Sequence, residues 1–299
     1  MNRKINTFCA FAFILANGPL ETGCGSSDEI VEPPPQWVLT RSDEFNSGTS
    51  PSPELWTIET GYGPNDDGWG NQEWQLYTDS PDNVRVEGGN LVISAQCLNA
   101  PDGPCGKRDG SITSARIKTQ VYDCDGDGDG DDRKCGFEQK NGRFEARIKL
   151  PEGRGLWPAF WMLGGNIDEV PWPGCGEIDI SEKFIEKPVV SGTLHGPGYS
   201  GGESISRDFS LPDGETFADD FHVFAVEWDP GRITFSVDSQ VFGIIRSAEV
   251  IARGDWVFDH EFFMLLNLAV GGNPVPDPSP TIFPAEMLVD YVRVFERAQ

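Results

Sequence analysis

Three carboxylates lie within six consecutive residues near the middle of the chain, at Glu177, Asp179 and Glu182. Ile178 and Ile180 lie between them and favour a β-strand. In a strand the isoleucines face one side, while Glu177 and Asp179 face the other. Crowding raises the pKa of at least one such carboxyl group. The three acids together can then supply a nucleophilic carboxylate and a proton-donating carboxylic acid, the pair that hydrolyses glycosidic bonds.

Glu182 breaks the alternation of this strand. It follows Glu177 by five positions, and a regular strand would direct it to the apolar side. We predict a β-bulge near Ile180 and Ser181 that absorbs one residue and returns Glu182 to the face of the other acids. The alternative is an ordinary solvated strand face that carries no chemistry.

Aromatic residues before the acids argue against a merely solvated face. Residues 155–163 read Gly-Leu-Trp-Pro-Ala-Phe-Trp-Met-Leu, and Trp172 stands five positions before Glu177. Indole rings combine a flat apolar face with a polar edge, which suits stacking on pyranose rings. Together with the acids, they predict a carbohydrate-binding cleft.

The elements that must position these residues are predicted to be strands. Residues 83–87 and 90–95 flank a Gly-Gly pair and predict a hairpin. Residues 262–268 form an apolar run, as in a strand buried on both faces. Alternating patterns recur in residues 114–120, 142–150, 222–228, 233–237 and 288–295. No segment predicts a long amphipathic helix, so the fold class is all-β, a sandwich or a barrel.

Composition narrows the classes of partner. Acids outnumber bases by 48 to 23 in the 299 residues, which gives a formal charge of -25. Such a field disfavours nucleic acid, anionic membrane surfaces and strongly anionic polysaccharides. The 35 glycines, 23 prolines and 9 tryptophans are typical of a turn-rich β protein rather than a helical bundle.

The N-terminal residues predict export. Residues 1–24 combine a basic start with an apolar run too short to span a bilayer. Cys24 follows a small residue, so we predict either a lipid anchor on Cys24 at the bacterial cell surface or free secretion. Glu21 stands where a lipoprotein signal usually has leucine. Residues 25–36 predict a Pro/Ser-rich linker, and residues 37–297 a single catalytic domain.

Five cysteines lie in that predicted domain. Because exported proteins form disulfides, we expect Cys97 to pair with Cys105 and Cys124 with Cys135. Cys175 is then left as a buried free thiol beside the acid strand.

The acid strand and its flanks resemble glycoside hydrolase family 16. Residues 176–182 match the bulged Glu-Ile-Asp-Ile-x-Glu form of the family signature, and the order of further motifs is similar to laminarinase-like members across about residues 37–296. The other matching segments are Trp69–Tyr77, Ser114–Ile117, Gly142–Arg147, Leu156–Met162, His195–Gly196 and Asp290–Val294.

This resemblance implies a fold, a reaction and roles for the acids. It implies a β-jelly-roll sandwich of two antiparallel sheets with a concave sugar-binding cleft, and an endo-1,3-β-glucanase of the laminarinase type. Glu177 looks like the nucleophile, Glu182 the general acid/base and Asp179 the assisting residue of a retaining double displacement. No cofactor is expected for catalysis.

The resemblance also implies a set of sugar contacts. Two polar side chains match positions that bind sugar hydroxyls, three tryptophans match or flank the cleft, and one histidine lies near the cleaved bond. These positions are Asn71, Arg116, Trp157, Trp161, Trp172 and His195. We expect a β-glucan partner, no nucleic acid and a monomer.

Two alternatives stay open. One is a family member that acts on mixed-linkage 1,3-1,4-β-glucan or on agar-type galactan, although lichenase-type members typically lack the residue that Ser181 adds. The other is a non-catalytic β-glucan-binding protein, which would keep the fold and the tryptophans but lose the glutamates that are present here.

A structural calcium ion is also expected away from the cleft. Family members often hold one with positions that match Glu44, Gly89 and Asp290. A second candidate is the loop of residues 123–132, in which aspartates alternate with glycines and offer oxygen ligands. An acidic loop without an ion is the alternative for that segment.

Overall fold

The structure is a computed structural model that describes residues 36–99, 105–124, 133–184, 188–278 and 283–298. The predicted export signal, most of the linker, the anchor at Cys24 and most of the acidic loop lie outside these residues. In the described part of the chain, no helix is long and apolar enough to cross a membrane. The predicted boundaries at residues 24 and 36 therefore stay predictions.

Strands make up about half of the described chain, and the α-helix α1 has five residues. The strands are β1 Trp37–Asp43, β2 Thr57–Glu59, β3 Leu76–Tyr77, β4 Val84–Glu87, β5 Asn90–Cys97, β6 Ile112–Ser114, β7 Arg116–Lys118, β8 Tyr122–Asp123, β9 Lys134–Cys135, β10 Glu138–Gln139, β11 Gly142–Lys149, β12 Leu156–Gly164, β13 Glu177–Glu182, β14 Val189–His195, β15 Ile205–Ser210, β16 His222–Asp229, β17 Arg232–Val237, β18 Gln240–Arg246, β19 Phe262–Val270 and β20 Ala285–Arg297. The helical turns are η1 Gly68–Gln72, η2 Gly201–Glu203 and α1 Ser247–Ile251.

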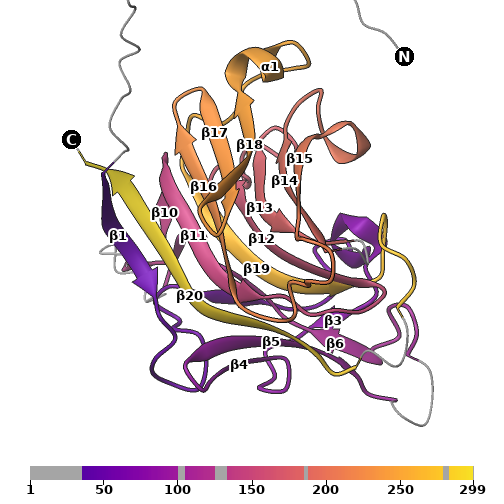
Figure 1. Ribbon diagram of the computed structural model, residues 1–299. Helices are drawn as coiled ribbons and strands as arrows, with labels where there is room; N and C mark the ends of the chain where they lie inside the picture. The colour runs from indigo at the N-terminus through magenta and orange to yellow at the C-terminus, as the bar shows by residue number, and fades with distance from the viewer. Residues whose placement is uncertain (1–35, 100–104, 125–132, 185–187, 279–282, 299) are drawn as a thin grey trace, which may run out of the picture. The chain divides into compact units, whose positions relative to one another are not determined.

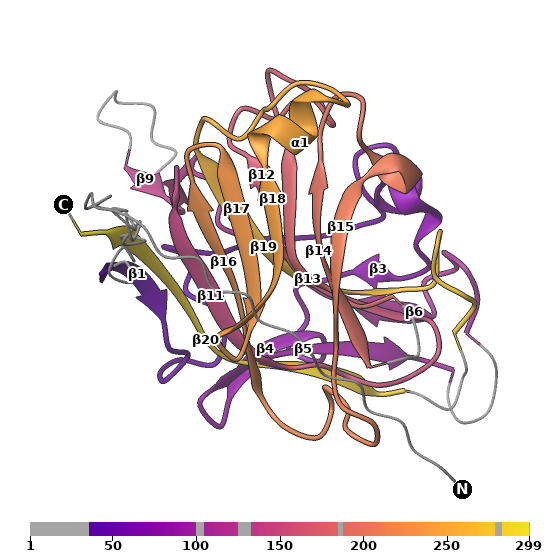
Figure 2. The same cartoon turned by 45° about the horizontal axis from the view of Figure 1, so that its top comes forward.

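Two large sheets pack face to face (Figures 1 and 2), and β8 and β9 form a separate two-stranded sheet. The eight-stranded sheet has the order β15-β14-β13-β12-β19-β7-β2, with β10 beside β19. The ten-stranded sheet has the order β18-β17-β16-β11-β20-β5-β6-β3, with β1 beside β20 and β4 beside β5. Pairing is antiparallel throughout the described strands, except that β3 runs parallel to β6. This arrangement confirms the predicted jelly-roll sandwich.

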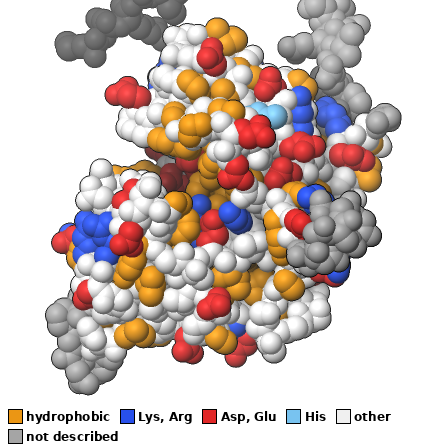
Figure 3. Space-filling model, turned by 180° about the vertical axis from the view of Figure 1, so that it is seen from behind, with side chains coloured by type: hydrophobic (Ala, Val, Ile, Leu, Met, Phe, Trp, Pro, Cys, Tyr) orange, Lys and Arg blue, Asp and Glu red, His pale blue; other side chains and the backbone are white. Residues whose placement is uncertain are grey.

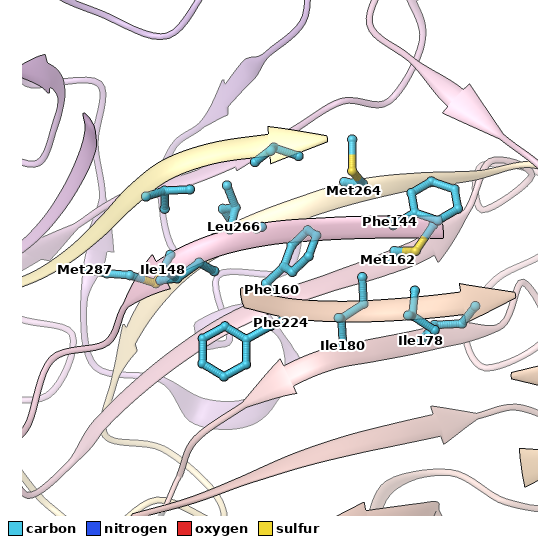
Figure 4. Close-up of a cluster of buried hydrophobic side chains, with 14 of the residues drawn as sticks. Phe144, Ile148, Phe160, Met162, Ile178, Ile180, Phe224, Met264, Leu266 and Met287 are labelled. Atoms are coloured by element: carbon cyan, nitrogen blue, oxygen red, sulfur yellow. The ribbon is translucent and has the colours of Figure 1, made fainter. Parts of the chain in front are cut away.

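The core lies between the two sheets. Figure 4 shows side chains from β12, β13 and β19 of one sheet meeting side chains from β11, β16 and β20 of the other. Ile178 and Ile180 of β13 are both fully buried here, at 0% and 1% exposure. The apolar face of the acid strand is therefore the core face, as the alternation predicted, and its acids face the opposite side.

Two local predictions are also confirmed. The β4–β5 hairpin turns on Gly88 and Gly89, whose positive φ angles of 60° and 79° suit a two-residue turn that matches the twist of the strands. All nine residues of β19 are buried. Because β12 and β7 pair with its two edges, β19 lies inside its sheet and holds the central part of the acid-bearing face.

Candidate active site

A β-bulge in β13 places the three acids on one face. Against β12, Asp179 pairs with Trp161 and Ser181 pairs with Phe160, so Ile180 is the extra residue. The register against β14 shifts over the same stretch, between Asp179 and Glu182. This extra residue restores Glu182 to the side of the other two acids. The predicted bulge is confirmed at its predicted position.

Indole N–H groups hold two of the acids. Trp172 Nε1 donates to Glu177 Oε2 at 2.9 Å, and Trp157 Nε1 donates to Glu182 Oε1 at 2.8 Å. Trp157 is only 7% exposed, whereas Trp172 is 45% exposed. Trp157 therefore supports Glu182 from within the structure, while Trp172 still presents a face to solvent.

His195 reaches the other side of the acid group. Its Nε2 lies 3.5 Å from Glu177 Oε1 and 3.2 Å from Asp179 Oδ2. The backbone N–H of Gly201 donates to His195 Nδ1 at 3.1 Å, so in the neutral ring the proton sits on Nε2. His195 thus presents an N–H toward Glu177 and Asp179.

This tautomer bears on whether the site could hold a metal. Oxygen and nitrogen atoms of Glu177, Asp179 and His195 lie within 4.8 Å of one another, close enough to surround one ion. A metal would need the lone pair of His195 Nε2, and the N–H of Gly201 keeps a proton there instead. The described geometry therefore does not favour a metal ion among these three groups.

Burial raises the pKa of all three acids. The pKa is about 8 for Glu177, for Asp179 and for Glu182, with desolvation as the largest cause in each case. The negative charge of Asp179 adds to the effect on both glutamates, and His195 and the indole N–H groups oppose it. Protons are therefore retained in this cluster near neutral pH, as acid catalysis requires.

Arg116 of β7 and Trp161 of β12, both predicted to contact sugar, pack against each other. The guanidinium carbon of Arg116 lies 4.4 Å from the ring centre of Trp69 and 4.8 Å from that of Trp161. Glu59 forms ion pairs with Arg116 and Lys118. Burial raises the pKa of Glu59, but these two cations lower it more, so the pKa lies below its usual value. The guanidinium group of Arg116 thus lies over both indole rings.

A buried polar network lies behind this stack. Trp161 Nε1 donates to Asn267 Oδ1 at 2.7 Å, and Asn267 Nδ2 donates to the hydroxyl of Tyr77 at 3.1 Å. The same network reaches Glu73, whose carboxylate accepts a hydrogen bond from Asn71 Nδ2 at 3.2 Å. Asn71, Arg116 and Trp161 are thereby brought to one region of the structure.

Sequence reasoning missed several of these residues as site components. Glu59, Trp69, Glu73, Tyr77 and Asn267 were given no role. Asn267 carried a usable signal, because it is the polar residue within an otherwise apolar buried run, and buried amides need partners.

Figure 3 shows that the molecule is hollowed on one face, where acidic and apolar side chains are visible inside the hollow. The profile of "Glycosyl hydrolases family 16" matches residues 110–260 of the chain. A "Beta-glucanase" from Rhodothermus marinus is 36% identical over 98% of this chain and 96% of its own length. The chain belongs to glycosyl hydrolase family 16.

The chain is also similar to two further proteins. The laminarinase catalytic domain from Thermotoga maritima is 43% identical, with a TM-score of 0.76 over 88% of this chain and 99% of that domain. The "Glucan endo-1,3-beta-glucosidase A1" from Niallia circulans is 37% identical over 86% of this chain. The chain spans only 38% of the length of that relative.

The positions expected to bind calcium in this family 16 protein lie near one another. Leu91 of β5 pairs with Val289 of β20, which sets Asp290 beside the β4–β5 turn that contains Gly89. A Cβ atom at Gly89 would lie 3.8 Å from Asn46 Oδ1, so the turn also approaches the segment after Glu44.

Arginines engage the two acidic side chains at this place. Both oxygens of Glu44 accept hydrogen bonds from Arg293, at 2.9 and 2.8 Å. Asp290 Oδ2 accepts from Arg147 at 2.8 Å. A calcium ion at this place would have to share or displace these ion pairs.

The cysteines pair as predicted. Disulfides join Cys97 to Cys105 and Cys124 to Cys135, which is typical of an exported protein. Cys175 is free and fully buried. Burial, with the nearby charge of Glu177, raises the pKa of its thiol to about 11, so the thiolate needed for reaction is disfavoured.

Proposed function

We propose that this family 16 enzyme is a retaining endo-glycosidase that hydrolyses the 1,3-β-linkages of laminarin-type glucan. The single observation that supports it most is the bulge in β13, which brings Glu177, Asp179 and Glu182 to one face beside indole rings. Relatives named β-glucanase and laminarinase support the choice of glucan. The whole protein's substrates are inferred here from relatives, one of which is much longer than this chain.

Glu177 is the nucleophile in this proposal. It receives the N–H of Trp172 and faces the Nε2 of His195, and donors favour the ionised form of a carboxyl group. Glu182 receives one indole N–H, from Trp157. In this proposal Glu177 acts as the ionised glutamate, and Glu182 acts as the one that keeps its proton.

The reaction then proceeds in two displacements. Glu182 donates its proton to the leaving glycosidic oxygen while Glu177 attacks the anomeric carbon and forms a glycosyl ester. Glu182, now ionised, accepts a proton from water, which attacks the same carbon and releases Glu177. Asp179 is 4% exposed and lies between the two glutamates on the strand, where its protonation state adjusts the charge that both experience.

Asn71, Arg116, Trp161, Trp172 and His195 are proposed to bind the glucan around these acids. The open ring of Trp172 offers a stacking face, while the stack of Arg116 and Trp161 offers both a ring and cationic N–H groups. Trp157 is assigned a smaller part in sugar binding than the sequence suggested, because it is buried and directed at Glu182.

The test is the release of reducing ends from laminarin, lichenan and agarose. We expect the fastest release from laminarin, with kcat reduced by about a thousandfold or more in Glu177→Ala and Glu182→Ala. The exposed Glu296→Gln is the control that keeps wild-type activity. Binding of laminarin without hydrolysis by the wild type would instead favour a glucan-binding protein.

Two further measurements separate the remaining alternatives. If reducing ends are released faster from lichenan or agarose than from laminarin, that polysaccharide is the preferred substrate instead. A first product with inverted anomeric configuration, read by proton NMR, would exclude the double displacement.

Export, anchoring and assembly complete the proposal. We propose that the protein acts as a monomer outside the cytoplasm, either lipid-anchored at Cys24 or free. Mass spectrometry of the mature N-terminus distinguishes the two forms, since an anchored protein begins at a diacylated Cys24. Light scattering coupled to size exclusion gives the assembly state.

A structural calcium ion at Glu44, Gly89 and Asp290 is also proposed, on the resemblance and on the proximity of these positions. If it binds, millimolar calcium raises the melting temperature relative to a chelator, and Asp290→Asn removes that difference. An equal melting temperature with calcium and with chelator would mean that no calcium binds here and that the carboxylates pair only with the arginines.

A further inference from the structure

Glu73 is a buried carboxylate outside the acid strand, to which the proposed mechanism gives no role. It is 4% exposed, and it accepts hydrogen bonds from three side chains. Asn71 Nδ2 donates to Oε1 at 3.2 Å, Gln75 Nε2 to Oε2 at 2.6 Å and the Tyr77 hydroxyl to Oε2 at 3.3 Å. Burying a carboxylate is costly, so a residue that only filled space here would be apolar.

Two of the three hydrogen bonds to Glu73 have a direction that is fixed by partners outside the network. The backbone N–H of Val270 donates to Gln75 Oε1 at 2.7 Å, which leaves only the amide N–H₂ of Gln75 to face Glu73. On the other branch, the indole N–H of Trp161 donates to Asn267 Oδ1. Asn267 must then use its N–H₂ toward Tyr77, as it does at 3.1 Å.

Tyr77 completes the second branch. Because its hydroxyl oxygen accepts from Asn267, its proton is free to be donated to Glu73. Gln75 and Tyr77 therefore both point donors at Oε2 of Glu73, and only an acceptor can occupy that position. A carboxylate oxygen accepts from both, whereas an N–H or O–H group there would set a donor against a donor.

We propose that Glu73 is a positioning residue whose carboxylate fixes the orientation of two sugar contacts, Asn71 directly and Trp161 through Tyr77 and Asn267. This proposal rests on the proposed function, since that function makes Asn71 and Trp161 sugar contacts. The chain of bonds Glu73–Tyr77–Asn267–Trp161 is called the relay below. The relay holds the indole of Trp161 beside Arg116, 4.8 Å from the guanidinium carbon.

The loop that carries Asn71 is folded around the same residue. The backbone N–H of Glu73 donates to the Gly68 carbonyl at 3.1 Å. Gly68 has a φ of 76°, and a Cβ atom there would lie 2.5 Å from the Glu73 nitrogen, so only glycine permits this approach. The Asn71 carbonyl accepts the N–H of Asn273 at 2.8 Å, which ties the loop to the segment after β19.

Two variants test the relay in the intact protein. Tyr77→Phe removes one hydroxyl and disconnects Glu73 from Asn267, while Glu73→Gln places an amide among donors. We expect KM for short laminarin oligosaccharides to rise about fivefold to tenfold in Tyr77→Phe, with kcat changed by less than about twofold. Glu73→Gln should raise KM further, and both should move the Trp161 indole N–H signal in a ¹H–¹⁵N spectrum, assigned by its loss in Trp161→Phe.

The matched control is Thr119→Val. Thr119 is also fully buried, and its hydroxyl donates to the Phe137 carbonyl and accepts the N–H of Met264, so its loss costs two buried hydrogen bonds away from the relay. We expect a comparable fall in melting temperature without a change in KM or in the Trp161 signal. An equal rise of KM in Thr119→Val, or an unmoved Trp161 signal in Tyr77→Phe, would overturn the proposal.

The outcomes also separate this inference from the proposed function. If the wild type fails to hydrolyse laminarin, the proposed function fails, but the position of the Trp161 signal still reports on the relay. If the wild type hydrolyses laminarin and Tyr77→Phe matches wild type in both KM and the indole signal, only the relay is excluded.

Discussion

Under the proposed function, Trp172 links substrate binding to the ionisation of the nucleophile. It is 45% exposed, its ring lies 6.0 Å from that of His195, and its N–H donates to Glu177. A sugar that stacks on this indole would therefore contact the same side chain whose N–H stabilises the Glu177 carboxylate. Binding and charge at Glu177 are connected through one side chain.

This connection predicts a shift in pH dependence. Trp172→Phe keeps an aromatic ring but removes the donor, so the pKa of Glu177 rises above its already raised value of about 8. Because the nucleophile must be ionised, we expect the acidic limb of the kcat/KM profile to move up by about 0.5 to 1 pH unit. Trp37→Phe, on β1, is the control. An acidic limb that stays in place would contradict the assignment of Glu177.

Individual residues were predictable from the sequence where the signal is local. Glu177, Asp179 and Glu182 are at most five positions apart, and the odd spacing of Glu182 itself indicates the bulge. Tyr77 and Asn267 are separated by 190 positions, so no local pattern connects them. Their partnership depends on the sheet order, which places β19 between β12 and β7.

At the scale of elements, β13 serves the core and the cleft at once. Its isoleucines enter the core between the sheets, and its acids face the other side. The bulge at Ile180 allows all six residues of the strand to keep this arrangement. Removing Ser181 would leave Glu177, Asp179 and Glu182 at strictly alternating positions, which a regular strand also places on one face.

Two single-residue deletions in this strand should therefore differ sharply. Deleting Ser181 leaves both isoleucines on the core face, so we expect a folded protein with altered activity. Deleting Ile178 turns Asp179 toward the core and Ile180 away from it, and we expect a loss of cooperative unfolding. Circular dichroism during heating distinguishes the two. Similar behaviour of both deletions would mean that the bulge does not set the register.

The elements that the sequence predicted are those with strong periodicity or a clear turn. The hairpin of β4 and β5 and the buried strand β19 belong to this group. The two-residue strand β3 and its parallel partner β6 were not anticipated. A pairing of two residues leaves no periodic pattern, because tertiary contacts rather than local propensity create it.

For the whole molecule, the acid cluster should oppose stability as the pH rises. A carboxyl group whose pKa is raised from 4.5 to about 8 on folding binds its proton more tightly in the folded state. Between those values the folded protein holds more protons, so the free energy of unfolding falls as pH increases. This contribution to stability is fully present below about pH 4.5 and is lost as pH passes through about 8.

Glu182→Gln should remove part of this dependence. We expect the variant to gain stability over wild type between pH 5 and pH 8, on the order of 1 kcal/mol or more, since one pKa unit corresponds to about 1.4 kcal/mol. Urea unfolding at several pH values measures it, and the exposed Glu296→Gln provides the comparison. A difference between Glu182→Gln and wild type that stays constant with pH would contradict the raised pKa.

Fold class and charge were predictable for the molecule as a whole, and the sheet order was not. Alternating strands and abundant glycine indicated an all-β sandwich or barrel, and the resemblance to the family pointed to the jelly-roll sandwich. The order β13-β12-β19-β7, however, joins segments separated by up to about half of the chain. It depends on burial of both faces of β19, one in the core between the sheets and the other in clusters on the opposite side, which no single segment encodes.

The bulged strand also determines how the site changes during turnover. Main-chain hydrogen bonds to β12 on one edge and β14 on the other hold β13, so the spacing of the acids is built before any ligand arrives. Preorganised groups need little rearrangement as charge develops at the anomeric carbon. A transition-state mimic should consequently bind in a single kinetic phase, without a slow isomerisation after encounter.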